Sequence, residues 1–345
     1  MKKKFLPLLV VFLVASSGAS VLAGDYAIAN SHYAPQIGLD SFNYSVQKRL
    51  ESIRLGSISL NYASAPLIRS DGALAAPASR SSSVRGASGG RQIDCVYNNG
   101  LTVWGDLYQT WASQSSGDGG HGYRYRATSP AVGIDWTSGA FTGGIATSYN
   151  WGKLKDKDGG GDLTARTWGL EAYGQYNAQK YYISADLGYG YTHYKSPSFH
   201  SNSLNLGAEF GLKFNFNDIL ITPHAGMRVF HDRRGAVERG NLPSSGRDSY
   251  YVWEIPMGVA VGYVFRAGGV MIMPQVKAGW TPELARRRSG FAGFSAPRRA
   301  RNGFILGAGL EARITQSLSG HLDYTANLRN NAYEHHWNLG VGFSF

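Results

Sequence analysis

The chain has 345 residues, a formal net charge of +11, and 43% hydrophobic against 17% charged residues. Its one cysteine, Cys95, excludes a secreted module held together by intrachain disulfides. The mean hydropathy of -0.24 is that of a soluble protein, but a membrane barrel whose strands have one water-facing side gives the same average. The 45 glycines and 21 tyrosines favour such a barrel.

Residues 1–23 have the pattern of a signal peptide. Three lysines follow Met1, residues 5–15 are apolar, and Val21-Leu22-Ala23 forms a cleavage motif. We expect the mature chain to begin at Gly24. The apolar run is too short for a membrane anchor, and no later run reaches the roughly 18 apolar residues of a transmembrane helix. Export therefore leads to a soluble protein or to a barrel.

Residues 24–95 are expected to be a short passenger and linker. An amphipathic helix is predicted near residues 41–55, with Asp40 or Ser41 as its cap. Residues 77–91 are rich in serine and glycine and have too little apolar surface to fold alone, which predicts a flexible linker. Apolar side chains of the helix recur at three- and four-residue spacing, at Phe42, Val46, Leu50 and Ile53.

Residues 96–345 alternate between apolar and polar side chains, as strands with one lipid-facing and one water-facing side do. We count about twelve such segments, an even number as bacterial barrels require. The sequence therefore predicts an all-β fold, a transmembrane antiparallel β-barrel. The segments lie near residues 99–112, 123–137, 140–152, 163–176, 180–195, 202–216, 218–231, 249–265, 269–282, 302–315, 317–329 and 333–345.

The links between these segments alternate in length. Links after even-numbered segments are short and turn-like, whereas those after odd-numbered segments are mostly long and polar, as at residues 153–162, 232–248 and 282–301. Outer-membrane barrels have short periplasmic turns and longer external loops. We therefore expect both ends of the barrel domain in the periplasm and the long loops at the cell surface.

The last strand has one apolar side. Such a strand would promote aggregation at the edge of a soluble sheet, whereas a closed barrel in a bilayer requires it. The apolar side is formed by His335, Trp337, Leu339, Val341, Phe343 and Phe345.

In their order and spacing, these features resemble the translocator domain of autotransporters over about residues 96–345, with the helix as a separate match. The resemblance rests on Phe42, Val46, Arg49 and Leu50 of the helix and on residues 103–105, 133–136, 168–174 and 182–190 of the strands.

The resemblance implies a twelve-stranded barrel with a helix in its pore, which delivers an N-terminal passenger to the cell surface. The chain departs from the family in one respect, because only residues 24–95 precede the barrel and passengers usually run to hundreds of residues. The resemblance also implies that the barrel-assembly machinery reads a signal formed by Trp337, Leu339, Val341, Phe343 and Phe345.

Two groups of charged residues are candidate sites. Inward strand positions carry charges that would keep the pore wet or act as a selectivity filter, namely Asp186, Glu209, Lys213, Glu254, Lys277, Glu311, Arg313, Asp323 and Arg329. One predicted external loop carries Arg286, Arg287, Arg288, Arg298, Arg299 and Arg301, and another carries Arg233, Arg234 and Arg239. Because arginine binds phosphate through paired hydrogen bonds, outer-membrane lipid and lipopolysaccharide are the expected partners, rather than nucleic acid.

No catalytic, cofactor or metal site is predicted. Residues 115–120 resemble the Gly-Asp-Ser-Gly of serine proteases, but Gly119 stands where the nucleophile would be. The histidines of His231-Asp232 and His335-His336 are interpreted as solvated residues of the rim, because His335 and His336 point to opposite faces of a strand and cannot easily share an ion.

The sequence thus predicts a monomeric outer-membrane barrel of autotransporter type without enzymatic activity. One alternative is a small porin whose N-terminal segment is only a plug or a periplasmic tail, and the conductance of the barrel with and without residues 24–95 separates the two. Another is an outer-membrane protease or lipase, for which the sequence offers no nucleophile.

Overall fold

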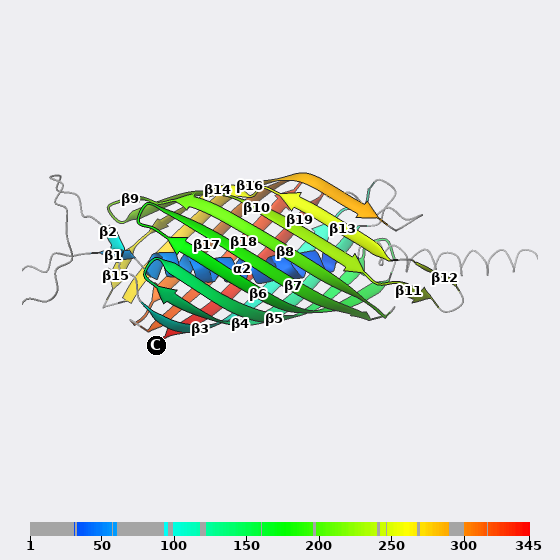
Figure 1. Ribbon diagram of the computed structural model, residues 1–345. Helices are drawn as coiled ribbons and strands as arrows, with labels where there is room; N and C mark the ends of the chain where they lie inside the picture. Colours follow the sequence, from blue (N-terminus) through cyan, green and yellow to red (C-terminus); the bar gives the residue numbers. More distant parts are fainter. Residues whose placement is uncertain are drawn as a thin grey trace, which may run out of the picture.

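A helix lies inside a closed β-barrel in the computed structural model (Figure 1). The structure describes residues 31, 33–56, 58–60, 93–95, 99–117, 122–159, 161–195, 198–239, 242–245, 247–267, 270–289, 300–315 and 317–345. The predictions made for residues 1–23 and 77–91, and for Arg298 and Arg299, lie outside these residues.

The barrel wall consists of twelve antiparallel strands, which confirms the predicted fold class. The last strand pairs with the first, with Leu339 opposite Leu107, and this pairing closes the wall. The strands are β3 (Gly100–Gln114), β4 (Tyr123–Ser138), β5 (Phe141–Asp156), β6 (Asp162–Asn177), β7 (Tyr181–Lys195), β8 with β9 (Phe199–Leu212 and Phe214–Phe216), β10 (Ile219–Arg234), β13 with β14 and β15 (Asp248–Glu254, Met257–Tyr263 and Phe265–Ala267), β16 (Val270–Ser289), β17 (Asn302–Arg313), β18 (Leu318–Arg329) and β19 (Ala332–Ser344).

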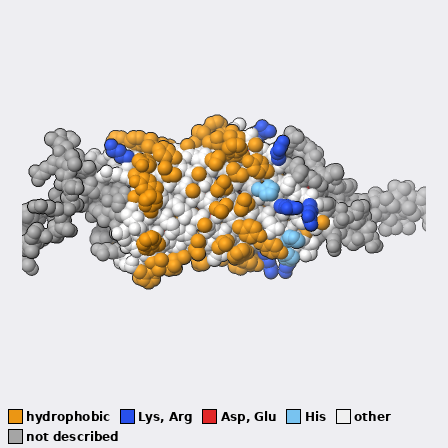
Figure 2. Space-filling view, viewed as in Figure 1, with side chains coloured by type: hydrophobic (Ala, Val, Ile, Leu, Met, Phe, Trp, Pro, Cys, Tyr) orange, Lys and Arg blue, Asp and Glu red, His pale blue; other side chains and the backbone are white. Residues whose placement is uncertain are grey.

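Strand periodicity decides which side chains face outward. In β7, Leu187 is 50% exposed whereas its neighbour Asp186 is 4% exposed, and the alternation continues along most of the strand. Only one register places the apolar side chains of such a strand toward lipid and its polar side chains toward the lumen, because a shift of one residue exchanges its two faces. Hydrophobic side chains accordingly cover the body of the outer surface (Figure 2).

The two ends of the barrel differ. At the short-turn end, links such as those after β4 and β9 are tight, and Gly139 and Asn217 adopt φ angles of 57° and 55°. Glycine and asparagine tolerate this left-handed conformation best. At the opposite end, here called the long-loop end, the link after β10 contains the hairpin of β11 (Val237–Arg239) and β12 (Leu242–Ser245).

The helix α2 (Tyr33–Gly56) begins earlier than the predicted residues 41–55. Asp40 does not cap it, because its carboxylate pairs with Arg228 of β10 at 3.3 Å. Ser41 does not cap it either, since its hydroxyl donates to the carbonyl oxygen of Ile37 within the helix, at 2.7 Å. The helix starts instead just before Pro35, a residue that the first turn accepts. No helix in the described part of the chain is both long and apolar enough to cross a membrane.

A short two-stranded sheet lies between the helix and the barrel. Its strands β1 (Ile58–Leu60) and β2 (Ile93–Cys95) are antiparallel partners at the short-turn end (Figure 1). The pairing joins the chain that leaves the helix to the chain that enters β3. The sequence analysis did not predict it, because the two strands are short and far apart in the sequence.

Candidate functional site in the barrel lumen

One side of α2 packs directly against the wall formed by β3 to β8. Its residues Leu39 and Phe42 are 2% and 1% exposed, and each lies over a glycine of the wall. A Cβ atom at Gly190 would come within 3.0 Å of Leu39 Cδ1, and one at Gly169 within 3.0 Å of Phe42 Cδ1. Glycine at these positions therefore allows the helix to approach the strands closely.

Polar side chains of the helix reach carboxylates on the same wall. Ser45 Oγ donates to Asp106 Oδ2 at 2.6 Å. Asn43 Nδ2 donates to Asp186 Oδ2 at 2.8 Å and to Glu171 Oε1 at 3.2 Å. Buried polar groups without partners are costly, so these bonds favour one position of the helix in the lumen.

Arg49 of the helix forms a bidentate ion pair with Asp135. Arg49 Nε and Nη2 donate to the two carboxylate oxygens at 2.7 and 2.9 Å, and the Asp135 side chain is fully buried. Tyr173 Oη also donates to Asp135, at 3.1 Å, and accepts a bond from Trp104 Nε1 at 2.7 Å. Three strands thus fix the guanidinium of Arg49.

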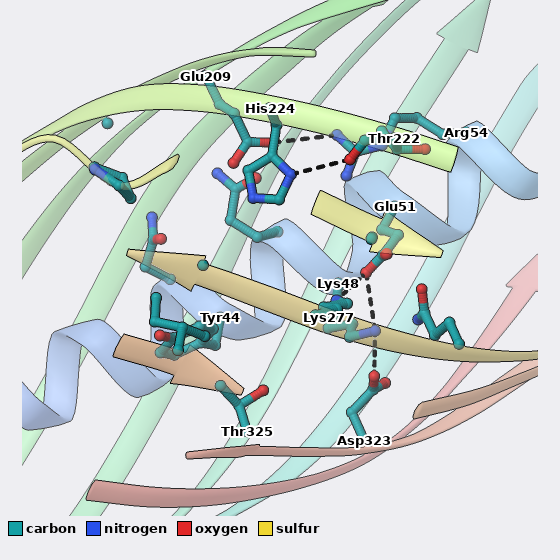
Figure 3. A pocket seen from close by; sticks show the side chains of 18 of the residues that line it. Tyr44, Lys48, Glu51, Arg54, Glu209, Thr222, His224, Lys277, Asp323 and Thr325 are labelled. Atoms are coloured by element: carbon teal, nitrogen blue, oxygen red, sulfur yellow. Dashed lines mark hydrogen bonds and ion pairs between the residues drawn. The ribbon is translucent and has the colours of Figure 1, made fainter. Parts of the chain in front are cut away.

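The other side of α2 faces a cavity of about 160 Å³ beside β10, β14, β16 and β18. Long charged side chains cross it (Figure 3). Lys277 Nζ lies 2.7 Å from Glu51 Oε2, and Lys48 lies 2.9 Å from the same oxygen while it also pairs with Asp323. The helix therefore packs tightly on one wall and is held to the other by ion pairs.

The long-loop end of the lumen is filled by an aromatic cluster of Tyr33, Tyr123, Tyr194 and Tyr250. The rings of Tyr33 and Tyr123 stack at 5.2 Å, and Tyr250 meets Tyr33 edge-on at 6.0 Å. Tyr194 Oη donates to the carbonyl oxygen of Ser31 at 2.8 Å. This end of the lumen is therefore packed with aromatic side chains.

These contacts set the direction of the helix. Its first residue, Tyr33, lies against Tyr123, which follows a long link, whereas Arg54 lies 3.9 Å above the ring of Tyr182, which follows a tight turn. The helix therefore enters the lumen at the long-loop end and leaves it at the short-turn end.

The charged residues predicted to line the pore all occupy inward positions. Asp186, Lys277 and Asp323 contact the helix directly. Arg329 Nη2 donates to Glu254 Oε1 at 2.7 Å, so this pair links two strands instead of reaching the helix. Glu209, which is partly buried, lies 3.9 Å from Arg54 of the helix. The others are Lys213, Glu311 and Arg313, of which Arg313 is only partly buried.

Several lumen residues were missed in the sequence analysis. Asp106, Glu171 and Arg228 contact the helix and have the same inward parity as the residues that were predicted. They could have been found by listing every charged residue at the inward-facing, alternate positions of each strand. Their partners on α2 carried no comparable signal, because the direction in which a helical side chain points depends on where the helix lies.

The interpretation of these histidines as solvated rim residues is wrong for His336. His336 is 3% exposed and lies 3.4 Å from Ser41 Oγ and 5.0 Å, between ring centroids, from Tyr44. Asp232 is fully buried and accepts a bond from Ser203 at 2.6 Å. Both side chains therefore lie inside the barrel and not at a solvated rim. Among the described residues, no group of three or more His, Cys, Asp or Glu side chains is placed to hold a metal ion.

The predicted basic loops are largely strand. β16 continues through Arg286, Arg287 and Arg288 because its ladder with β13 extends to the pair Ser249 and Ser289. Arg286 is turned inward and pairs with Glu283, whereas Arg287 and Arg301 are exposed. Arg233 and Arg234 belong to β10, and Arg234 is buried near Asp248 at 3.7 Å, while Arg239 ends β11.

The apolar residues of the last strand face outward. Phe345 is 74% exposed, and its backbone nitrogen donates to the carbonyl oxygen of Leu101 at 2.9 Å. The bond fastens the end of the chain to the first strand of the barrel. The exposed set is Trp337, Leu339, Val341, Phe343 and Phe345.

The fold and the lumen together define a transmembrane β-barrel whose pore is occupied by a helix from its own chain. Residues 103–325 match the family model described as the autotransporter β-domain, which is more than half of the chain. The chain belongs to this family.

The comparisons with individual proteins agree with this assignment. The probable autotransporter YpjA of Escherichia coli strain K12 is 25% identical over 277 residues, which cover 72% of this chain and 17% of that protein. The chain thus spans about a sixth of the length of this relative.

Solved structures show the same fold at low sequence identity. The β-domain of the Bordetella autotransporter BrkA aligns with a TM-score of 0.58 at 16% identity, over 72% of this chain and all of that one. The translocator domain of NalP from Neisseria meningitidis gives 0.58 at 16% identity over 71% and 89%. The transport unit of AIDA-I from Escherichia coli gives 0.57 at 16% identity over 71% and 90%.

Proposed function

We propose that this chain inserts in the outer membrane and delivers the segment N-terminal to Tyr33 to the cell surface. The observation that supports the proposal is the course of α2, which enters the lumen at the long-loop end and leaves it at the short-turn end. Because the long loops of outer-membrane barrels are external, the chain before Tyr33 emerges outside the cell.

Export and assembly would use the two ends of the chain. Residues 1–23 would direct the chain across the inner membrane, and the outward apolar residues of β19 would be read by the barrel-assembly machinery. One barrel encloses one helix of its own chain, which supports a monomer as the working unit. The barrel would carry out transport and no bond-breaking step; its family match concerns the β-domain and not the chemistry of the N-terminal segment.

Surface labelling of intact cells tests the proposal. An epitope inserted after Asp25 should be reached by antibody in intact cells. The same epitope inserted between Ala178 and Gln179, in a tight turn, should be reached only after permeabilisation. Labelling of the Asp25 insertion only after permeabilisation would contradict the proposal, provided that the barrel still shows its folded band on a semi-native gel.

A small channel is the second candidate, and the cavity beside α2 favours it. The aromatic cluster at the long-loop end favours a closed pore instead. Our proposal predicts low conductance of the purified barrel in planar bilayers and a rise when residues 24–95 are deleted. A channel would conduct before the deletion and change little after it.

A further inference from the structure

A group of exposed cations faces outward at the long-loop end of β4, β5 and β6. We call it the basic array; it consists of Arg124, Arg126, Lys153, Lys155 and Arg166. Lys, Arg and His side chains gather mainly near this end of the barrel (Figure 2). The short-turn ends of the same strands and of β7 instead carry outward aromatic residues, namely Trp136, Phe141, Tyr176 and Tyr181.

The register places like charges directly opposite each other. Arg124 is the partner of Lys155, and Arg126 is the partner of Lys153. Cross-strand pairs of like charge destabilise a sheet. Asp162 offsets part of this repulsion, since its carboxylate lies 2.7 Å from Lys153 and 4.0 Å from Lys155. It is the one carboxylate at the outward positions of these three strands within the described residues, so positive charge remains in excess.

The array lies at the level expected for lipid head groups. Trp151, which is 48% exposed, stands directly opposite Arg166 and two residues before Lys153. Aromatic belts mark the boundary between hydrocarbon and water. Two residues of a strand advance roughly 6.6 Å, so the lysines of β5 lie just beyond that boundary, where lipid phosphates are found.

We propose that the basic array binds the phosphate groups of lipopolysaccharide in the outer leaflet. The inference rests on the proposed function, which places the long-loop end at the cell surface. Arginine and lysine suit this ligand because guanidinium groups bind phosphate oxygens in pairs and ammonium groups add point charges. A phosphate between the facing cations would also remove the repulsion across the β4–β5 ladder.

Native mass spectrometry of the folded, full-length mature chain with purified lipid A tests the inference. The array variant is Arg124→Gln/Arg126→Gln/Lys153→Gln/Lys155→Gln. The matched control, Arg233→Gln/Arg247→Gln/Arg287→Gln/Arg301→Gln, removes the same charge from exposed positions elsewhere on the barrel. We expect the array variant to bind bisphosphorylated lipid A at least about tenfold more weakly than the unmodified chain, and the control to bind it almost as the unmodified chain does. Dephosphorylated lipid A should bind the unmodified chain about as weakly as the phosphorylated lipid binds the array variant.

Three outcomes would overturn the inference. The first is that the array variant binds lipid A as tightly as the unmodified chain does. The second is that the control loses as much affinity as the array variant, which would mean that net charge alone matters. The third is that inorganic phosphate displaces the lipid, which would mean that the site takes free phosphate. If the array variant shows no folded band, the pair Arg126→Gln/Lys153→Gln replaces it in the same comparison. The epitope experiment does not depend on these residues, so failure here leaves the proposed function standing.

Discussion

Replacing Arg49 by methionine should loosen α2 without opening the barrel. The change leaves the fully buried carboxylate of Asp135 without its cation. Removal of one partner from a buried ion pair costs about 3 to 5 kcal/mol. Because Tyr173 Oη still donates to Asp135, at 3.1 Å, we expect the lower value, about 3 kcal/mol, which corresponds to roughly a 100-fold change in an equilibrium constant.

Hydrogen exchange measured by mass spectrometry on the folded barrel reports this change directly. Amides of Tyr33–Gly56 exchange through opening of the helix, and their rates should rise by roughly 100-fold in Arg49→Met. Amides of barrel strands such as β6 and β7 should keep their protection, because their ladders do not include Arg49.

Two further variants decide whether the ion pair is responsible. Arg233→Met removes an exposed, outward cation and should leave helix exchange unchanged. Arg49→Met/Asp135→Asn removes both charges and should recover much of the lost protection, because no buried charge is left unpaired. Unchanged exchange in Arg49→Met, or an equal loss of protection in the strands, would refute the reasoning.

The other predictions concern the wall, the last strand and the aromatic cluster. Leu206→Arg puts a cation on the lipid-facing side of β8 and should cost about 2 to 4 kcal/mol in vesicle refolding titrations, with Leu206→Val as the control; equal costs would contradict the assigned faces. Deletion of Gly342–Phe345 should abolish the folded band on semi-native gels, and an intact band would count against the role of the closing strand. Tyr33→Ala should raise single-channel conductance, whereas Tyr149→Ala, on the outer surface, should not; equal conductance would show that the aromatic cluster does not close the pore.

The strands could be predicted because lipid and water act on each residue locally. A segment such as β7 shows its two faces in its own sequence, through Leu187 on one side and Asp186 on the other. The start of α2 could not be found in this way. Its supposed cap, Asp40, is bonded to Arg228, which is 188 positions away along the chain, and such a partner appears only when the barrel has closed.

The lumen shows the same limit. Asp135 was part of the motif on which the family resemblance rested, but nothing in its neighbourhood indicates that Arg49 of the helix is its partner. The arginines assigned to loops were misplaced for a related reason, because the length of β16 beyond the membrane depends on its pairing with β13. The side of the barrel wall on which each strand residue lies was therefore predictable, whereas contacts between distant elements were not.

The position of α2 inside the lumen is tested most directly by a disulfide between the helix and the wall. A Cβ atom at Gly190 would lie 3.2 Å from Leu39 Cγ, so cysteines at these two positions are within bonding distance. With Cys95 replaced by serine, Leu39→Cys/Gly190→Cys should yield a linked tryptic peptide after mild oxidation of the folded barrel. Tyr44→Cys/Gly190→Cys should not, because Tyr44 faces the cavity. Absence of the linked peptide from the first pair, or equal yields from both, would contradict a helix held in the lumen.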